Sequence, residues 1–199
     1  MNHRQIEEWD SLLKIKTSGR DDSISNTINY PYEPTNYPVL ERFANAGYIR
    51  KADCLLDYGC GKGRVGFFMS YQTRCRSIGI DYDERMIQGA LTNQKTAVSG
   101  RRTEFFCENA GRYAVPADVN RIYFFNPFSV EILEQVLARI TESYYENPRE
   151  ILFFFYYPSD DYIGRLMRED MLEFLDEISC EDLFESNDSR ERIMIFRME

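Results

Sequence analysis

Residues 55–66 read LLDYGCGKGRVG, and this stretch decides the fold of the chain. A mostly apolar run, residues 52–58, stops abruptly at glycine, which is typical of a buried strand that enters a tight turn. Gly59, Gly61 and Gly63 then alternate, and a turn without Cβ atoms lets a ligand approach the backbone. The helix-like pattern that follows would direct free N–H groups and a positive dipole end toward that ligand. The alternative is a glycine-rich turn that binds nothing.

The spacing of these glycines separates two kinds of nucleotide-binding loop. The dinucleotide fingerprint is G-x-G-x-x-G, whereas this loop is D-x-G-x-G-x-G and begins at Asp57. A carboxylate at that position suits a ligand with a positive charge better than it suits a pyrophosphate. The loop resembles motif I of the class I S-adenosylmethionine (SAM) dependent methyltransferases, where it lies against the methionine part of the cofactor. The resemblance implies SAM as the cofactor, bound by Asp57, Tyr58 and the three glycines.

Length and charge restrict the class of protein and of partner. The 199 residues fit one domain, and 33 acidic against 24 basic residues give a net charge of -9. Residues 169–199 alone hold eleven acids and three arginines. An acidic surface repels polyphosphate, so nucleic acid is disfavoured as a partner, although a local basic cleft keeps it open.

Cysteine usage and hydropathy indicate the compartment. The five cysteines include no C-x-x-C pair, which predicts neither a disulfide framework nor a metal site and fits a reducing cytoplasm. Residues 1–10 lack the apolar core of a signal peptide, and the longest apolar run, residues 151–157, is too short to span a bilayer. We therefore expect a soluble, cytoplasmic protein without a membrane segment.

Two parts of the chain are expected, an N-terminal part of residues 1–38 and a SAM-binding domain of residues 39–199. Helical spacing of apolar residues over 4–16 predicts a helix, which either packs on the domain or covers the cofactor cleft as a lid. A loop rich in proline follows and contains Tyr32 among several tyrosines. This loop either forms a wall for a ligand or packs on the surface, and Tyr32 is the candidate to assist at the sulfonium.

The remaining chain alternates strand and helix patterns. Strands are expected at 52–58, 76–81, 103–107, 120–125, 150–157, 173–185 and 191–198, and further helices at 39–48, 84–99, 129–145 and 161–168. This order implies a parallel sheet covered on both faces, with an antiparallel edge. The layout resembles the class I methyltransferase fold: a doubly wound, mostly parallel seven-stranded α/β sheet with helices on both faces and an antiparallel C-terminal edge hairpin.

The residues at the ends of the strands are the candidates for ligand contacts, because open parallel sheets bind ligands there. Asp81 ends the second strand, and its carboxylate can accept both hydroxyl hydrogens of a ribose. This argues for an adenosine-type ligand, the alternative being an acid that only begins a turn. Tyr82 and Met86 are expected on the two sides of the adenine.

At the end of the third strand the chain departs from the family that it resembles. An aspartate is usual near this point and accepts a hydrogen bond from the adenine amino group. Here the position is held by Asn109, followed by Ala110. The amide oxygen of Asn109 can still accept this bond, and Glu108 competes for the role.

The fourth strand ends in Asn126-Pro127-Phe128. This resembles the Asn/Asp-Pro-Pro-Tyr/Phe motif of methyltransferases that modify amino or amide nitrogens. The resemblance implies that the Asn126 oxygen accepts hydrogen bonds from the target nitrogen and that the Phe128 ring stacks on a planar target. The chain has one proline where the motif has two, so Phe128 stands one position early. The alternative is that Pro127 merely ends a strand before a helix.

These observations predict a SAM-dependent methyltransferase. The sole histidine, His3, lies near the N-terminus, which disfavours a histidine base and excludes a Ser-His-Asp hydrolase. Methyl transfer requires mainly in-line alignment and exclusion of water. We expect an unidentified acceptor, with a nitrogen of a protein side chain or small molecule favoured. Two alternatives stay open: a non-catalytic SAM-binding regulatory protein, and a nicotinamide-dependent oxidoreductase, which the glycine spacing disfavours.

Overall fold

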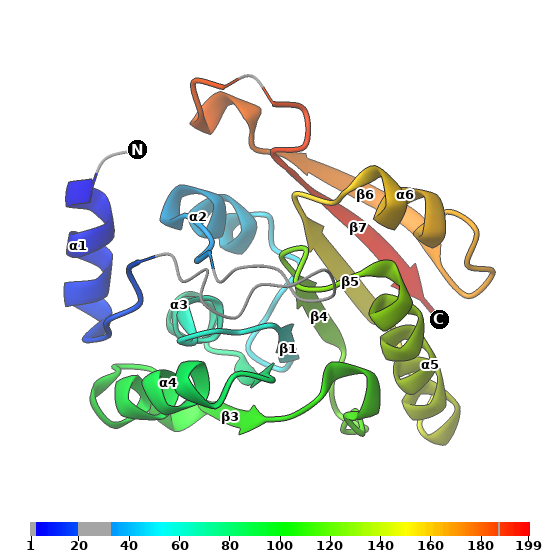
Figure 1. Ribbon diagram of the computed structural model, residues 1–199, viewed down its shortest axis with the longest axis horizontal. Helices are drawn as coiled ribbons and strands as arrows, with labels where there is room; N and C mark the ends of the chain where they lie inside the picture. Colours follow the sequence, from blue (N-terminus) through cyan, green and yellow to red (C-terminus); the bar gives the residue numbers. More distant parts are fainter. Residues whose placement is uncertain (1–2, 20–32, 187) are drawn as a thin grey trace.

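The computed structural model describes residues 3–19, 33–186 and 188–199. A single sheet forms its centre, with helices on both faces (Figure 1). Within the described residues the strand order is β3-β2-β1-β4-β5-β7-β6, and β7 is antiparallel to both of its neighbours. The predicted doubly wound sheet with an antiparallel C-terminal edge is confirmed. The strands are β1 (Cys54–Tyr58), β2 (Arg76–Asp81), β3 (Thr103–Cys107), β4 (Arg121–Phe124), β5 (Ile151–Tyr156), β6 (Glu173–Ser179) and β7 (Arg192–Met198).

The helices divide between the two faces of the sheet, with α2, α3 and α4 on one side and α5 and α6 on the other (Figure 1). Alternate residues of a strand point to opposite faces, so Leu55 joins the first core and Leu56 the second. The helices are α1 (His3–Leu13), α2 (Tyr37–Asn45), α3 (Arg64–Gln72), α4 (Glu84–Thr96), α5 (Val130–Glu146) and α6 (Asp160–Leu166), with short 3-10 turns η1 (Gly100–Arg102), η2 (Ala110–Arg112) and η3 (Glu181–Leu183). In the described part of the chain, none of these helices has the length and apolar character needed to cross a membrane.

Several predicted boundaries shift by a few residues, for identifiable reasons. Helix α4 ends at Thr96 and not at 99, because the Ser99 hydroxyl donates to the Phe67 carbonyl oxygen at 2.8 Å and turns the chain toward η1. Helix α2 begins earlier than predicted, with proline in its first turn, where the missing N–H is tolerated. Strand β6 ends at Ser179 and not at 185, because η3 follows.

The described part of the N-terminal segment packs on the domain. Trp9 of α1 contacts the Phe68 ring edge-on at 4.9 Å and lies 5.8 Å from the Tyr37 ring. Its indole N–H donates to the Glu41 carboxylate at 2.7 Å. Helix α1 is therefore attached to α2 and α3 by an aromatic contact and a hydrogen bond.

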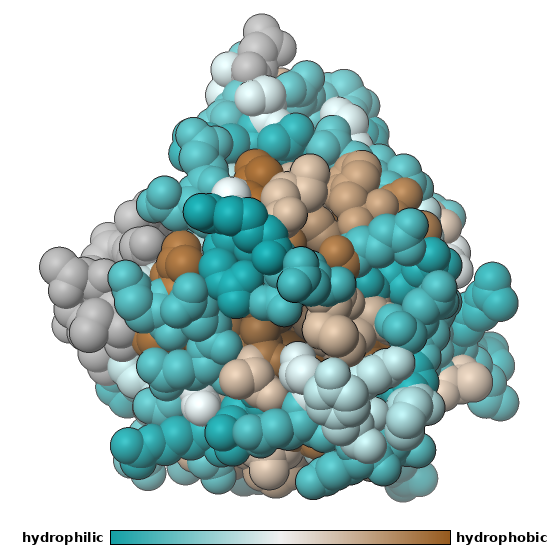
Figure 2. All heavy atoms as spheres, turned by 90° about the vertical axis from the view of Figure 1, so that its right-hand side faces the viewer, coloured by the Kyte–Doolittle hydropathy of each residue, from teal (hydrophilic) through white to brown (hydrophobic). Residues whose placement is uncertain are grey.

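Strand β6 forms one edge of the sheet and is exposed along most of its length. Phe174 and Leu175 of this strand and Met167 after α6 are large exposed apolar residues. Figure 2, which faces the right-hand side of Figure 1, shows apolar groups interspersed with hydrophilic ones on this side of the molecule. Acidic residues also lie along β6, and charges on an edge strand oppose pairing with another sheet.

Candidate functional site

The glycine-rich loop joins β1 to α3 in a left-handed backbone conformation. Gly59, Gly61 and Gly63 have φ values of +74°, +52° and +85°, which glycine adopts without the steric penalty of a Cβ. The N–H groups of Gly59 and Cys60 both donate to the carbonyl oxygen of Ile80, at 2.9 and 3.0 Å. The loop is thus bonded to the carboxyl end of β2, where the adenosine contacts are predicted.

Close packing requires glycine at two of these positions as well. A Cβ on Gly59 would lie 2.6 Å from the Cβ of Pro127, and one on Gly63 would lie 2.6 Å from the ring of Phe105. Both distances are shorter than van der Waals contact. The loop therefore touches the turn that follows β4, which carries the predicted acceptor residues.

Replacement of Gly63 by alanine should destabilise the fold more than the same change at Gly47. The two glycines have nearly equal φ, +85° and +81°, but a Cβ on Gly47 would meet nothing within 4 Å. Both variants carry backbone strain of about 1–3 kcal/mol, and Gly63→Ala adds an overpacking penalty of about 1–3 kcal/mol. Urea denaturation measures the difference. Equal losses of unfolding free energy in the two variants would show that contact with Phe105 adds no destabilisation.

Asp57 is a buried carboxyl that has an unused acceptor. Its side chain lies at the end of β1 with 3% relative exposure, and Oδ2 has no hydrogen-bond partner among the described residues. Burial, together with the negative charge of Asp81, raises the pKa of Asp57 to about 8. An unpartnered buried carboxyl is unfavourable, so the position fits a cationic group that neutralises it, such as the ammonium of a methionine moiety.

Asp81 accepts backbone hydrogen bonds with both carboxylate oxygens. Oδ2 accepts from the Gly61 N–H at 2.9 Å, and Oδ1 accepts from the Asp83 N–H at 2.9 Å. Burial raises the pKa of Asp81, against these backbone hydrogen bonds. Each oxygen retains a second lone pair, so Asp81 has the capacity to accept ribose hydroxyls as well as to hold the turn.

The predicted adenine residues lie at the ends of β2 and β3. Tyr82 is 43% exposed, whereas Met86 of α4 is buried. Asn109 is exposed, and its Oδ1 accepts from the Gly111 N–H at 3.0 Å, which caps η2 at Ala110. Because one lone pair of this oxygen is already engaged, the predicted bond to an adenine amino group would be its second.

Tyr58 differs in orientation from its neighbour Asp57. Its ring packs in the second core, parallel to the Phe124 ring at 5.1 Å, and only 1% of the residue is exposed. Burial raises the pKa of its hydroxyl, which has no hydrogen-bond partner among the described residues. The side chain thus lies on the face of the sheet opposite Asp57, and a cofactor contact from Tyr58 would involve its backbone.

Asn126 follows β4 with an unusual backbone and an unpartnered oxygen. Its φ is +43°, a left-handed value that is uncommon for residues other than glycine. Its Oδ1 is buried and has no hydrogen-bond partner among the described residues. Since buried amide oxygens are nearly always paired, this oxygen is an acceptor available to a donor that enters the site.

Phe128 does not lie in an open cleft. The residue is 4% exposed, and its ring packs edge-on against Tyr58 at 6.3 Å and Phe124 at 6.2 Å. In this structure the ring belongs to the second core, and its stacking on a planar target stays a prediction. The other predicted aromatic contact, Tyr32, lies outside the described residues.

A buried polar network around Arg64 was not predicted. Arg64 begins α3 and is 2% exposed; its Nε donates to the Thr17 hydroxyl at 2.7 Å and its Nη1 to the Thr35 carbonyl oxygen at 3.2 Å. The guanidinium carbon lies 4.6 Å from the centre of the Tyr37 ring. Asp10 accepts from the Tyr37 hydroxyl and from the Thr17 N–H. The network attaches the N-terminal segment to the residue directly after the glycine loop.

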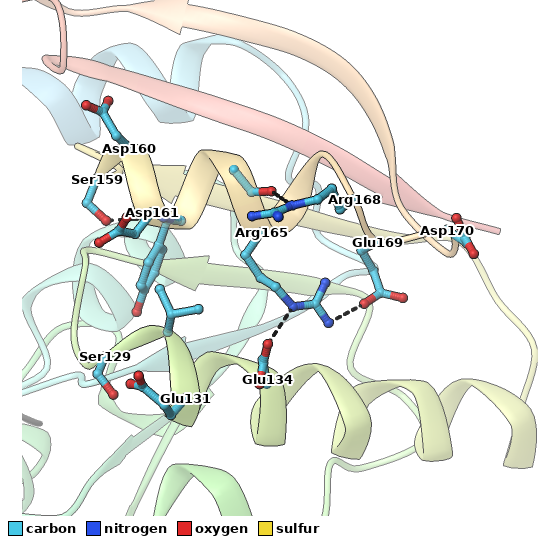
Figure 3. Close-up of a pocket in the computed structure, with 13 residues that line it drawn as sticks. Ser129, Glu131, Glu134, Ser159, Asp160, Asp161, Arg165, Arg168, Glu169 and Asp170 are labelled. Atoms are coloured by element: carbon cyan, nitrogen blue, oxygen red, sulfur yellow. Dashed lines mark hydrogen bonds and ion pairs between the residues drawn. The ribbon is translucent and has the colours of Figure 1, made fainter.

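A pocket of about 840 Å³ lies between the first turns of α5 and the length of α6 with the residues that follow it (Figure 3). Six acidic residues lie in its lining, and Arg165 pairs there with Glu134 at 3.1 Å and Glu169 at 2.7 Å. Several of the acids stand in the first turn of a helix, where they stabilise its positive dipole end. Helix stability and the ion pairs of Arg165 account for most of these charges, and we assign no ligand to the pocket. The acidic residues of the lining are Glu131, Glu134, Asp160, Asp161, Glu169 and Asp170.

Comparison with known proteins shows that the central part of the chain is similar to methyltransferases. Residues 55–145 match the family described as "Methyltransferase domain". A protein-lysine N-methyltransferase of Saccharolobus islandicus is 29% identical over 80 residues, which are 39% of this chain and 50% of that protein. The matched stretch thus spans only half the length of this relative.

Solved structures show the same fold at low sequence identity. An RNA methyltransferase from Salinibacter ruber, in complex with S-adenosylhomocysteine (SAH), superposes with a TM-score of 0.54 at 17% identity and covers 83% of this chain and 92% of its own. A tRNA (uracil-54, C5)-methyltransferase from Pyrococcus abyssi, also with SAH, gives a TM-score of 0.60 at 12% identity and covers 84% and 40%. Residues 55–145 therefore form a methyltransferase domain, and the sheet topology and glycine loop agree with the Rossmann-like fold of class I SAM-dependent methyltransferases.

Proposed function

We propose that this protein transfers a methyl group from SAM to a nitrogen atom of its acceptor. The buried, unpartnered Oδ1 of Asn126 carries this proposal. It lies at the carboxyl end of a central strand, next to the loop that backs onto the cofactor. The similarity to a protein-lysine N-methyltransferase supports a nitrogen on a protein side chain, with a small molecule as the other candidate. The net charge of -9 argues against a polyphosphate acceptor.

The residues present fit the cofactor. The three glycines of the loop leave the backbone accessible to a ligand at their positions. Asp57 offers a carboxyl for the cofactor ammonium, and Asp81 offers acceptors for the ribose hydroxyls. SAM, when bound, supplies a methyl group that is already activated by its sulfonium. The adenine contacts are assigned to Tyr82, Met86, Asn109 and Ala110.

The protein contributes orientation more than acid–base chemistry. The Asn126 oxygen would accept a hydrogen bond from the target N–H and so direct the nitrogen lone pair toward the methyl group. Holding the reacting atoms in line supplies a large part of the rate enhancement, and exclusion of water supports it. A regulatory protein that only binds SAM has no need of such an acceptor, so Asn126 favours an enzyme.

The N-terminal segment, residues 1–38, is proposed to cover the cofactor cleft over the domain of residues 39–199. The Arg64 network supports this, because it holds Asp10 and Thr17 beside the residue that follows Gly63. Tyr32 keeps its proposed role of assisting at the sulfonium. A cytoplasmic location remains a prediction from the sequence.

Methyl transfer itself is tested by incubating the protein with methyl-labelled SAM and fractions of a cell extract. Label is expected in a protein or small-molecule fraction, in a form that survives treatments that hydrolyse methyl esters, because the bond formed is to nitrogen. Transfer only to oxygen or carbon would contradict the proposed acceptor. Absence of SAH binding would contradict the cofactor.

SAH binding should release close to one proton per site at about pH 7. Asp57 is mostly protonated at that pH, since burial and Asp81 raise its pKa to about 8. A cofactor ammonium would lower this pKa and expel the proton, so affinity should rise as the pH increases toward 8. Calorimetry in two buffers of different ionisation enthalpy measures the release. Asp57→Asn is the control and should release none; an equal release from this variant would assign the proton to another group.

A further inference from the structure

A cation is held at the carboxyl end of β5 by an aromatic ring and a carboxylate. The guanidinium carbon of Arg190 lies 4.6 Å from the centre of the Tyr157 ring. The same guanidinium donates to both oxygens of Asp188, from Nε at 3.1 Å and from Nη2 at 2.7 Å. The Tyr157 hydroxyl also donates to Asp188, at 2.7 Å. Tyr157 and Asp188 thus form a site with the chemistry that recognises lysine and arginine side chains.

This site lies one strand away from Asn126. Strands β4 and β5 are parallel neighbours in which Phe124 stands opposite Phe155. Two residues further along the strands come Asn126 and Tyr157, and both have left-handed backbones, with φ of +43° and +51°. Such strain in residues other than glycine concentrates at functional sites. The pair therefore points to one site that extends across the ends of both strands.

Phe125 connects the two residues. It precedes Asn126, and its ring lies 6.5 Å from the Tyr157 ring, nearly perpendicular to it, and 4.6 Å from the Tyr156 ring. The residue next to Asn126 thus places its ring against the rings of Tyr156 and Tyr157, so contacting aromatic side chains join the two positions. An acceptor could place one side chain at Asn126 and a neighbouring one on Tyr157.

Arg190 is weakly held where it lies. Its side chain is 51% exposed and that of Asp188 is 26% exposed. Ion pairs that water can reach are weakened by solvent screening. A cation from another molecule can therefore replace Arg190 at small cost, and gains the contacts that the ring and the carboxylate already offer.

We propose that Tyr157 and Asp188 bind a positively charged side chain of a basic polypeptide acceptor, and that Arg190 occupies this place in the free protein. The inference rests on the proposed function and specifies its substrate as a polypeptide with lysine or arginine beside the methylated nitrogen. The bound cation is not the reacting group, because a carboxylate and a ring face stabilise the protonated form, whereas methylation needs a free lone pair.

The test measures binding of fluorescein-labelled octalysine to the SAH-saturated protein by anisotropy. Salt is kept at about 0.15 M, where attraction between exposed charges is screened beyond about 8 Å. Asp188→Asn and Tyr157→Leu should each weaken binding about fivefold, since each removes one of the two contacts to the cation. Arg190→Gln should tighten binding about threefold, because the competing guanidinium is gone.

The chain supplies a matched control for net charge. Arg197 and Glu173 form a similar ion pair at the other end of β7, with Nη2 and Oε2 2.6 Å apart. Glu173→Gln and Arg197→Gln make the same charge changes away from Tyr157, and each should alter the dissociation constant less than twofold. Thermal melting of every variant verifies that the fold is retained.

The site would be supported if Asp188→Asn raises the dissociation constant for octalysine and Arg190→Gln lowers it, both by more than the control variants do. Equal responses in the two pairs would overturn it, because they would show attraction by net charge alone. Tighter binding of a labelled oligouridylate of equal length would also overturn it, in favour of a nucleic acid. Absence of SAH binding by the wild type would instead contradict the proposed function. Failure of the cation site and failure of the proposed function are therefore distinguishable.

Discussion

Asn126→Ala is expected to lower the turnover of the methyl transfer about a hundredfold, the size of effect that loss of correct alignment produces, while SAH binds with unchanged affinity. The reason is that Oδ1 of Asn126 is a buried oxygen with no partner among the described residues, free to hold the acceptor nitrogen. Single-turnover kinetics with labelled SAM and calorimetry with SAH give the two quantities. The effect should fall on the rate and not on the acceptor's KM if the contact forms mainly in the transition state.

Two further variants distinguish the role of the Asn126 side-chain amide in activity from the role of its left-handed backbone in stability. Asn126 has a φ of +43°, so alanine adds left-handed strain that glycine does not. Asn126→Gly should therefore lose as much activity as Asn126→Ala but retain more stability. Asn126→Asp retains an acceptor oxygen and should recover part of the rate. Wild-type turnover in the glycine variant would mean that Asn126-Pro127 only ends the strand.

Asp81→Ala is expected to weaken SAH binding about 10- to 100-fold, because hydrogen bonds to a charged group contribute about 1.5–3 kcal/mol. The variant would lose the proposed ribose contacts and also the hydrogen bond from the Gly61 N–H to Asp81, which holds the glycine loop. Asp83→Ala makes the same charge change two residues away. Asp83 instead caps α4, so its loss should leave SAH affinity nearly unchanged.

A thermodynamic cycle that combines Asp81→Ala with 2′-deoxy-SAH isolates the proposed contact between Asp81 and the ribose. If Asp81 accepts the 2′ hydroxyl, the wild type should bind the deoxy analogue more weakly than SAH. Asp81→Ala should then bind both ligands equally, since the coupling is lost. An unchanged preference in the variant would mean that Asp81 only supports the loop and that the ribose contact lies elsewhere.

Local patterns predicted most of the fold. Strands β2 and β3 have the bounds that the sequence predicted, 76–81 and 103–107, because apolar runs bounded by turn residues define strands without knowledge of the rest of the chain. The left-handed turns of the glycine loop were also predictable, since glycine is the residue that such backbones select. The resemblance to class I methyltransferases is confirmed by the sheet order and the family match.

Contacts between distant parts of the chain escaped prediction. Arg64 appeared to be an ordinary helix residue, and no local signal indicated that Asp10, Thr17 and Thr35 would surround it. The backbone of Asn126 and the burial of Phe128 depend equally on packing against strands that are remote in sequence. Side-chain periodicity and turn residues depend on neighbours along the chain. They therefore do not predict which polar residues contact each other in the folded protein.

The close approach of Gly59 to Pro127 has a consequence for how such an enzyme can evolve. A Cβ at position 59 would lie 2.6 Å from the Cβ of Pro127, so the glycine loop and the turn after β4 are in contact with no room for a carbon added at Gly59. A side chain at position 59 would therefore require a change at position 127 as well. Selection for a new acceptor is therefore expected to alter the surrounding loops, and to leave this pair of residues in place.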